Sequence, residues 1–122
     1  MTTQEIQTIQ IPTTENAFFK AISMAYYNEE TFHALMRSWV MNHFQGLGYK
    51  ELAQTDDIWT SPYNMTALNV LSTILNVRIL FYEYQPESQT IKKHVFGDAA
   101  QNIKILRKDL NTYEVLKFHI DI

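Results

Sequence analysis

Few residues in this chain are equipped for acid–base or metal chemistry. Its 122 residues include 13 carboxylates and four histidines but no cysteine, which excludes a thiolate nucleophile, a thiolate metal site and a disulfide. No two histidines have the i, i+4 spacing of a zinc pair, and no acidic segment has the spacing of a calcium loop. We therefore expect neither a metal nor another cofactor. The histidines are His33, His43, His94 and His119.

The elements that must position these residues begin with three amphipathic helices. Apolar residues recur at i, i+3 and i+4 from Phe18 to Tyr26, and again from Phe32 to Phe44, which is the spacing of a helix with one buried face. A third helix is expected over residues 64–75, where Met, Leu and Ile residues follow the same period. The first half of the chain is therefore predicted to be helical.

Polar residues and glycines mark the expected ends of these helices. Asn16 or Thr14 is the expected N-cap of the first helix, and Asn64 is the expected N-cap of the third. Gly46 and Gly48 are expected to end the second helix, since glycine takes the left-handed conformation without a Cβ clash.

Beyond residue 76 the periodicity changes to that of β-strands, because β-branched and aromatic residues alternate with polar ones. Residues 1–10 are rich in Thr and Gln and are expected to form a loose leader or an edge strand. The predicted fold class is α+β, with N-terminal helices packed on a small, mostly antiparallel sheet in one domain spanning residues 1–122. The later strands are expected over residues 77–82, 90–96, about 103–105 and about 112–120.

Composition narrows the choice of partner and compartment. Hydrophobic residues make up 46% of the chain, which favours a folded core, and the formal charge is −3 with no run of basic residues. Nucleic acid is therefore not an expected partner. No apolar run reaches the roughly 18 residues that a membrane span needs, and the first twenty residues lack a signal-like apolar block. We expect a cytoplasmic or nuclear protein without a membrane partner.

Three segments, in the same order, resemble the ovarian tumour (OTU) family of deubiquitinating cysteine proteases. Residues 13–23 resemble the segment that begins the catalytic helix of that family, with Ala17 at the position of the nucleophilic cysteine. Residues 63–83 are similar to a family helix and the strand after it. Residues 111–116 are similar to the segment that carries the general-base histidine, with Thr112 at the position of that histidine.

The resemblance implies a particular chemistry, and three positions depart from it. In such a protease a thiolate at a helix N-terminus attacks the isopeptide carbonyl, and a neighbouring imidazole activates it. Ala17 provides no nucleophile, and the hydroxyl of Thr112 cannot act as a base because it does not ionise near neutral pH. Thr14 occupies a position that is often aspartate in the family. All three positions that match the catalytic set are therefore empty or unsuited.

His119 is the only histidine near the last predicted strand. It lies seven residues beyond Thr112, roughly 23 Å along an extended strand, and strand alternation places it on the opposite face. A β-bulge would be needed to bring the pair His119 and Asp121 into a catalytic role.

The resemblance therefore implies a catalytically inactive OTU-like domain that binds another protein, either ubiquitin or a regulatory partner. Two alternatives stay open: an active OTU cysteine deubiquitinase captured with its nucleophile changed to alanine, and an interaction domain that uses a surface unrelated to the protease cleft. Loss at Thr14 and Thr112 as well as Ala17 favours a domain that is not an enzyme. The sequence predicts no oligomeric state. The candidate cleft residues are Asn16, Tyr113, Glu114, Trp59 and Tyr63.

Overall fold

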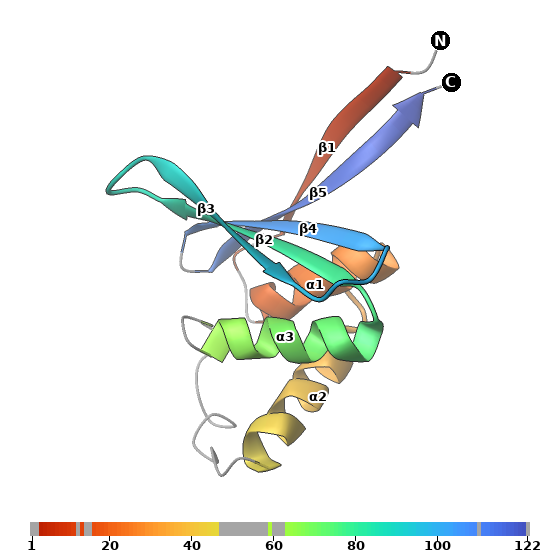
Figure 1. Cartoon of the computed structure of the whole chain (residues 1–122), viewed down its shortest axis with the longest axis vertical. Helices are drawn as coiled ribbons and strands as arrows, with labels where there is room; N and C mark the ends of the chain where they lie inside the picture. Colours follow the sequence, from red (N-terminus) through yellow and green to blue (C-terminus); the bar gives the residue numbers. More distant parts are fainter. Residues whose placement is uncertain are drawn as a thin grey trace.

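The computed structural model describes residues 3–11, 13, 16–46, 59, 63–109 and 111–121, of which 3–7 and 118–121 are described by their backbone only (Figure 1). Helices and strands follow the predicted order, so the α+β class is confirmed. The elements are β1 (Thr3–Ile11), α1 (Ala17–Tyr27), α2 (His33–Gly46), α3 (Tyr63–Leu75), β2 (Arg78–Gln85), β3 (Thr90–Phe96), β4 (Asn102–Asp109) and β5 (Thr112–Asp121).

The described strands form one five-stranded sheet in the order β1-β5-β4-β2-β3. Strands β2 and β4 are parallel, and the other three neighbouring pairs are antiparallel, so the expectation of a mostly antiparallel sheet is confirmed. The N-terminal segment forms the edge strand β1, which pairs along its whole length with β5. Strand β3 lies at the other edge of the sheet.

All three helices lie on one side of this sheet, as Figure 1 shows. The core between them is built from the apolar stripes of the helices and from alternate strand residues. Phe18, Phe19 and Ile22 of α1 are fully or almost fully buried, as are Phe81 of β2 and Ile105 of β4. None of the helices in the described part of the chain is both long and apolar enough to span a membrane.

Asn16 lies at the predicted N-cap position of α1 but does not cap the helix through its side chain, and Asn64 is not the N-cap of α3. Asn16 occupies the cap position of α1 in the left-handed conformation, at φ 63°, but its side chain makes no capping hydrogen bond. Its Oδ1 atom instead accepts a hydrogen bond from Arg37, at 3.4 Å. Asn64 lies inside α3, which begins one residue earlier, and its amide group is buried without a hydrogen-bond partner. Thr14 and Gly48 lie outside the described residues.

The C-terminal end of α1 is tied to strand β5. Asn28 follows the helix in the left-handed conformation, and its backbone N–H donates to the carbonyl of Met24 at 3.0 Å. The ammonium group of Lys117 donates to the carbonyl of Ala25 at 2.9 Å and to the side-chain oxygen of Asn28. A cation here stabilises the negative end of the helix dipole. Partial burial lowers the pKa of Lys117.

Gly97, the residue after β3, lies close to Ser72 of α3. Its φ is +84°, and a Cβ atom added there would lie 2.2 Å from Oγ of Ser72 and 2.9 Å from the carbonyl oxygen of Val77. Ser72 is itself buried and donates to that carbonyl at 2.8 Å. A side chain at residue 97 would therefore break a buried hydrogen bond as well as strain the backbone.

We predict that Gly97→Ala lowers the free energy of unfolding by about 2–4 kcal/mol, because left-handed backbone strain adds to a buried clash. Gly46→Ala is the matched control, since a Cβ at this helical residue would meet nothing within 4 Å. It should be neutral or stabilise by up to about 1 kcal/mol. Urea unfolding measures both variants, and equal effects would contradict the close approach at Gly97.

Candidate functional site

Ala17 is the first residue of α1, and none of its surface is exposed to solvent. It belongs to the hydrophobic core together with Phe18 and Phe19. The position that matches the family nucleophile therefore carries a methyl group that is enclosed by core residues. The side chain at this position is therefore not in contact with solvent.

Aromatic rings enclose the first turn of α1. The ring of Trp59 stacks on that of Phe18 with centroids 5.8 Å apart, and it meets Phe19 edge-on at 5.1 Å. Phe44 of α2 lies 6.0 Å from the same indole. The Arg37 guanidinium lies 5.9 Å from the ring centroids of both Phe19 and Trp59, within cation–π range. These rings form one continuous aromatic layer over the start of the helix.

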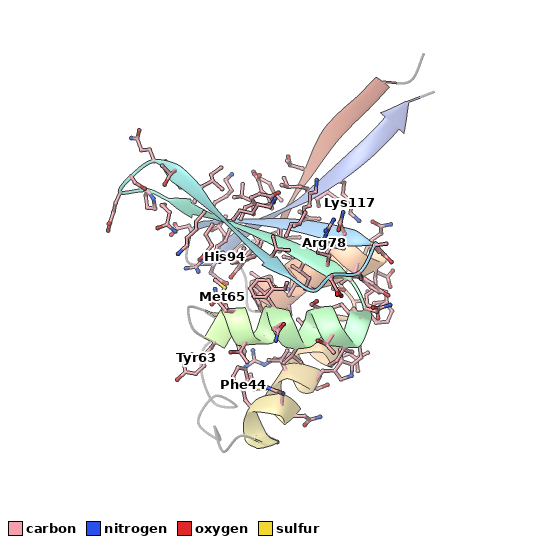
Figure 2. All side chains as sticks on the ribbon, in the orientation of Figure 1. Phe44, Tyr63, Met65, Arg78, His94 and Lys117 are labelled. Atoms are coloured by element: carbon pink, nitrogen blue, oxygen red, sulfur yellow. The ribbon has the colours of Figure 1, made fainter. Side chains whose placement is uncertain are left out.

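Trp59 and Tyr63, two of the three aromatic residues of the predicted cleft, have different environments. Trp59 is only 2% exposed and belongs to the core, so it is no exposed anchor for a partner. Tyr63 is 38% exposed, and its ring meets that of Phe44 edge-on at 5.9 Å. Figure 2 shows Tyr63 pointing away from α3, on the side opposite the sheet. Of the two, only Tyr63 offers a surface for binding.

Residues 112–114 begin strand β5 and point alternately to its two faces. Tyr113 points to the helices, is fully buried, and packs against Phe18 with ring centroids 5.9 Å apart. Its hydroxyl group has no hydrogen-bond partner, and burial raises the pKa of Tyr113 above its ordinary value. The hydroxyl of Thr112 is paired with that of Thr13 at 3.1 Å. Thr112 thus ties β5 to the segment before α1.

Glu114 lies on the face of the sheet that the helices do not cover. Its Oε1 atom accepts hydrogen bonds from Lys108 at 2.8 Å and from Gln10 at 3.1 Å. The hydrogen bond from Lys108 is the main reason that the pKa of Glu114 lies below its usual value. Glu114 therefore joins β1, β4 and β5 and does not face Ala17.

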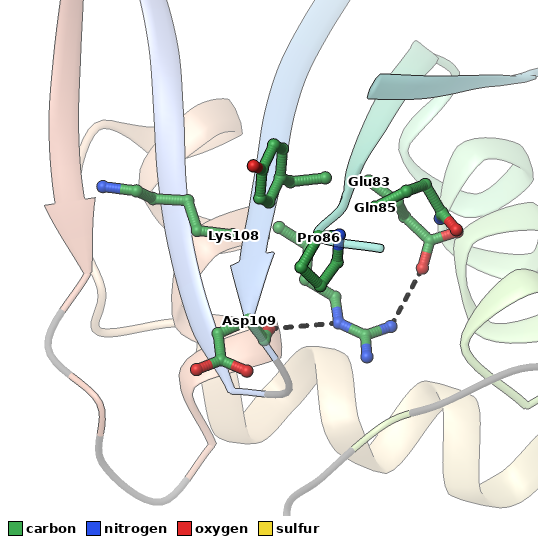
Figure 3. Close-up of a pocket in the computed structure, with 7 residues that line it drawn as sticks. Glu83, Gln85, Pro86, Lys108 and Asp109 are labelled. Carbon is green, nitrogen blue, oxygen red and sulfur yellow. Dashed lines mark hydrogen bonds and ion pairs between the residues drawn. The ribbon is translucent and has the colours of Figure 1, made fainter. Parts of the chain in front are cut away.

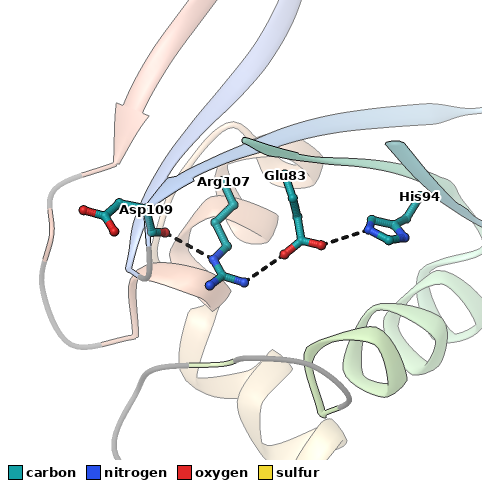
Figure 4. Close-up of polar contacts among 4 residues, drawn as sticks. All are labelled: Glu83, His94, Arg107 and Asp109. Atoms are coloured by element: carbon teal, nitrogen blue, oxygen red, sulfur yellow. Dashed lines mark hydrogen bonds and ion pairs between the residues drawn. The ribbon is translucent and has the colours of Figure 1, made fainter. Parts of the chain in front are cut away.

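A charged network that the sequence did not suggest lies on the helix-covered face of the sheet (Figure 4). The carboxylate of Glu83 on β2 contacts Nε2 of His94 on β3 at 2.9 Å and accepts from Nη1 of Arg107 on β4 at 2.9 Å. Arg107 Nε also donates to the carbonyl of Asp109 at 3.2 Å. All three side chains of the network are largely buried, at 13–20% exposure.

His94 does not supply the missing base. Three strand spacings separate β3 from β5, about 14 Å across the sheet, so its imidazole is remote from Thr112. The rings of Phe81 and Phe96 flank it with centroids 6.2 and 6.5 Å away, and Figure 2 shows Met65 of α3 beneath the same region. His94 is therefore a packed residue with a carboxylate partner.

The other histidines lie no closer to a catalytic arrangement. His33 and His43 are on α2, and the backbone of His119 pairs with Glu5 far along the β1–β5 ribbon, which Figure 1 shows extending away from the helices. The side chain of His119 is outside the described residues. Within the described part of the chain, no group of three or more His, Asp or Glu residues is arranged to hold a metal ion.

A polar pocket of about 230 Å³ opens beside the charged network (Figure 3). It lies where the parallel strands β2 and β4 end, which is where open sheets with parallel strands commonly bind ligands. Asp109 on its rim pairs with Thr112 in the β4–β5 register, so the pocket adjoins the position of the family base. It contains cations and carboxylates but no nucleophile or imidazole. Its lining residues are Glu83, Tyr84, Gln85, Pro86, Arg107, Lys108 and Asp109.

The contact between Glu114 and Lys108 predicts a pH dependence of stability. A folded-state pKa below the ordinary value of 4.5 means that the folded protein binds the proton less tightly than the unfolded chain. The contribution of Glu114 is therefore complete above about pH 5 and is lost as the pH falls through the lower, folded-state pKa.

We predict that Glu114→Gln lowers the free energy of unfolding at pH 7 by about 0.5 kcal/mol and flattens its fall between about pH 5 and 3. Urea unfolding of Glu114→Gln, Lys108→Gln and the double variant across this range measures the coupling. Strictly additive effects at pH 7 would show that the two side chains do not interact.

No protein-family model matches this sequence, and a search of curated proteins finds no match. Solved structures do match. The OTU domain of OTUD1 is 17% identical, covers 90% of this chain and 85% of its own, and has a TM-score of 0.65. The viral OTU domain protease from Farallon virus is 14% identical, covers 96% and 89%, and has a TM-score of 0.69.

A third match is an OTU domain solved in complex with ubiquitin, at 17% identity and a TM-score of 0.63, covering 94% of this chain and 72% of its own. At 14–17% sequence identity, these structural matches show a shared fold and not a shared activity. The OTU-like fold expected from the three sequence segments is confirmed: the chain has the fold of OTU domains, and it contains no cysteine.

Proposed function

We propose that this chain is a catalytically inactive OTU-fold domain that acts as a protein-binding module, with ubiquitin as the first candidate partner. The observation that carries this proposal is the complete burial of Ala17 in a chain without cysteine. Thr112, at the position that the resemblance assigns to the general base, also supports the proposal, because its hydroxyl is hydrogen-bonded to that of Thr13. The OTU fold persists although the groups that would perform thiol chemistry do not.

An active deubiquitinase with only its nucleophile replaced is less well supported by these contacts. Restoring a thiol at residue 17 would place it under the aromatic layer of Phe18 and Trp59. No described histidine lies near Thr112 to activate that thiol. Both the side chains and the access route would have to change, which favours loss of function across the whole site.

Ubiquitin is supported as a candidate by the neighbour solved in complex with it. Of the cleft residues named from the sequence, Trp59 and Tyr113 are buried, whereas Tyr63 is exposed. Asn16 is partly exposed and accepts from Arg37. Of these residues, Tyr63 and Asn16 are therefore the ones whose side chains a partner could contact.

We predict that ubiquitin added to the ¹⁵N-labelled protein shifts amide resonances around Tyr63, and that ubiquitin chains incubated with the protein stay intact. Tyr63→Ala should weaken binding at least about tenfold if this ring is a central contact. Ile91→Ala is the matched control, because Ile91 is 58% exposed but lies on β3, and it should bind as the unaltered chain does. Cleavage would contradict the inactive assignment, and an absence of shifts would exclude ubiquitin.

A second prediction concerns access to residue 17. Ala17→Cys should react with iodoacetamide on the order of 100-fold more slowly than Ser88→Cys, the factor expected when labelling requires an opening that costs about 3 kcal/mol. Ser88 is exposed in the turn between β2 and β3 and reports the unhindered rate. Mass spectrometry follows both reactions. Equal rates would show an open cleft at residue 17.

A further inference from the structure

We propose that edge strand β3 binds an extended segment of a partner protein, one whose side chains alternate between apolar and acidic residues. The segment would add to the sheet as a further strand. This inference rests on the protein-binding role proposed above but not on ubiquitin as the partner, and it concerns a surface remote from Ala17.

Strand β3 has a free edge within the part of the chain that the structure describes. It is the last strand of the sheet order and pairs with β2 through residues 90–96. Figure 1 shows the β2–β3 hairpin reaching out beyond the helices. An edge strand presents unpaired backbone N–H and C=O groups, which an added extended segment can satisfy.

Apolar side chains are concentrated on the solvent face of this hairpin. Ile91 is 58% exposed and Val95 is 52% exposed, and both point away from the helices. Tyr84, at 40% exposure, pairs with Ile91 in the β2–β3 register. Half of the six exposed large hydrophobic side chains in the described residues thus lie together here. A cluster of this kind on a soluble domain commonly marks a protein contact.

The charge on the same face selects the partner. Lys93 lies among these apolar side chains on β3, and Lys104 and Lys108 lie on the same face of β4, where Lys108 pairs with Glu114 of β5 at 2.8 Å. Lys93 lies between Ile91 and Val95, and the exposed Lys92 faces the other side of the strand. A complementary strand would therefore present an acidic residue between two apolar ones, and a second acidic residue opposite Lys92. The outward residues of β2, β3 and β4 are Arg78, Leu80, Tyr82, Tyr84, Ile91, Lys93, Val95, Asn102, Lys104, Leu106 and Lys108.

Two other occupants fit this surface less well. A second copy that paired antiparallel about the middle of β3 would place Lys93 directly opposite Lys93, a destabilising pair of like charges. Tyr82, Tyr84 and the lysines would suit stacked bases, but the most exposed residues are the aliphatic Ile91 and Val95, and the net negative charge opposes nucleic acid. An acidic and apolar protein segment satisfies both the charge and the side-chain types.

The test uses a fluorescein-labelled peptide with the core Val-Thr-Glu-Glu-Val, which would pair antiparallel with β3, titrated with the full chain by fluorescence anisotropy. We expect saturable binding that Ile91→Ser/Val95→Ser weakens at least about tenfold, because the apolar contacts are lost. Ile74→Ser is the matched control: Ile74 is 47% exposed but lies on α3, so binding should be unchanged. Thermal unfolding of each variant shows whether the fold is kept.

Two further arms test the charge and the backbone contacts. Lys93→Glu should weaken binding of this peptide about tenfold and should restore binding of a peptide with lysine in place of the facing glutamate. N-methylation of the peptide N–H groups that pair with β3 should abolish binding, whereas N-methylation of the alternate groups should not.

Three outcomes would overturn the proposal. The first is an absence of peptide binding, or peptide binding that is insensitive to residues 91 and 95. The second is displacement of the peptide by single-stranded DNA at lower concentration than by unlabelled peptide, which would indicate a nucleic-acid surface. The third is sedimentation of the free chain as a dimer that Ile91→Ser dissociates. Failure of ubiquitin to bind would leave these results unaffected, because that titration depends on Tyr63 and not on Ile91.

Discussion

The structure depends on the packing of the first turn of α1 against the start of β5. The ring of Phe18 packs against those of Tyr113 and Trp59, and all three side chains are at most 2% exposed. Removing a buried aromatic ring of this kind typically costs about 3–5 kcal/mol, a large share of the stability of a small domain. This contact positions the helix whose first residue, Ala17, is fully buried.

The same contact shows that the surroundings of Ala17 and Thr112, as well as their side chains, differ from what thiol chemistry would need. A thiol at residue 17 would lie in the core, where burial raises the pKa of cysteine and makes it unreactive. On β5, Tyr113 takes the inward position and Thr112 is held by Thr13. The charged contacts of Glu83 with His94 and Arg107 lie instead on strands β2, β3 and β4. The fold thus conserves its architecture while its ionisable groups serve packing and strand pairing.

Periodicity was enough to predict the helices, and β-propensity with turn residues was enough to predict the strand from Thr90 to Phe96 to the residue. The environment of Trp59 could not be predicted, because a single aromatic residue in a segment without periodicity gives no signal of burial. Asn64 looks like a cap in sequence, but the helix begins one residue before it. The network of Glu83, His94 and Arg107 needed the register of three strands, including a parallel pair that local sequence does not encode.

The fluorescence of Trp59 reports whether its indole is buried among the aromatic rings at the start of α1. The chain has two tryptophans, so Trp39→Phe leaves Trp59 as the single indole reporter. Because Trp59 is only 2% exposed, we expect its emission to be blue-shifted and only weakly quenched by iodide or acrylamide in the folded protein. Red-shifted emission quenched as strongly as free tryptophan, in a variant that remains folded by circular dichroism, would contradict this burial.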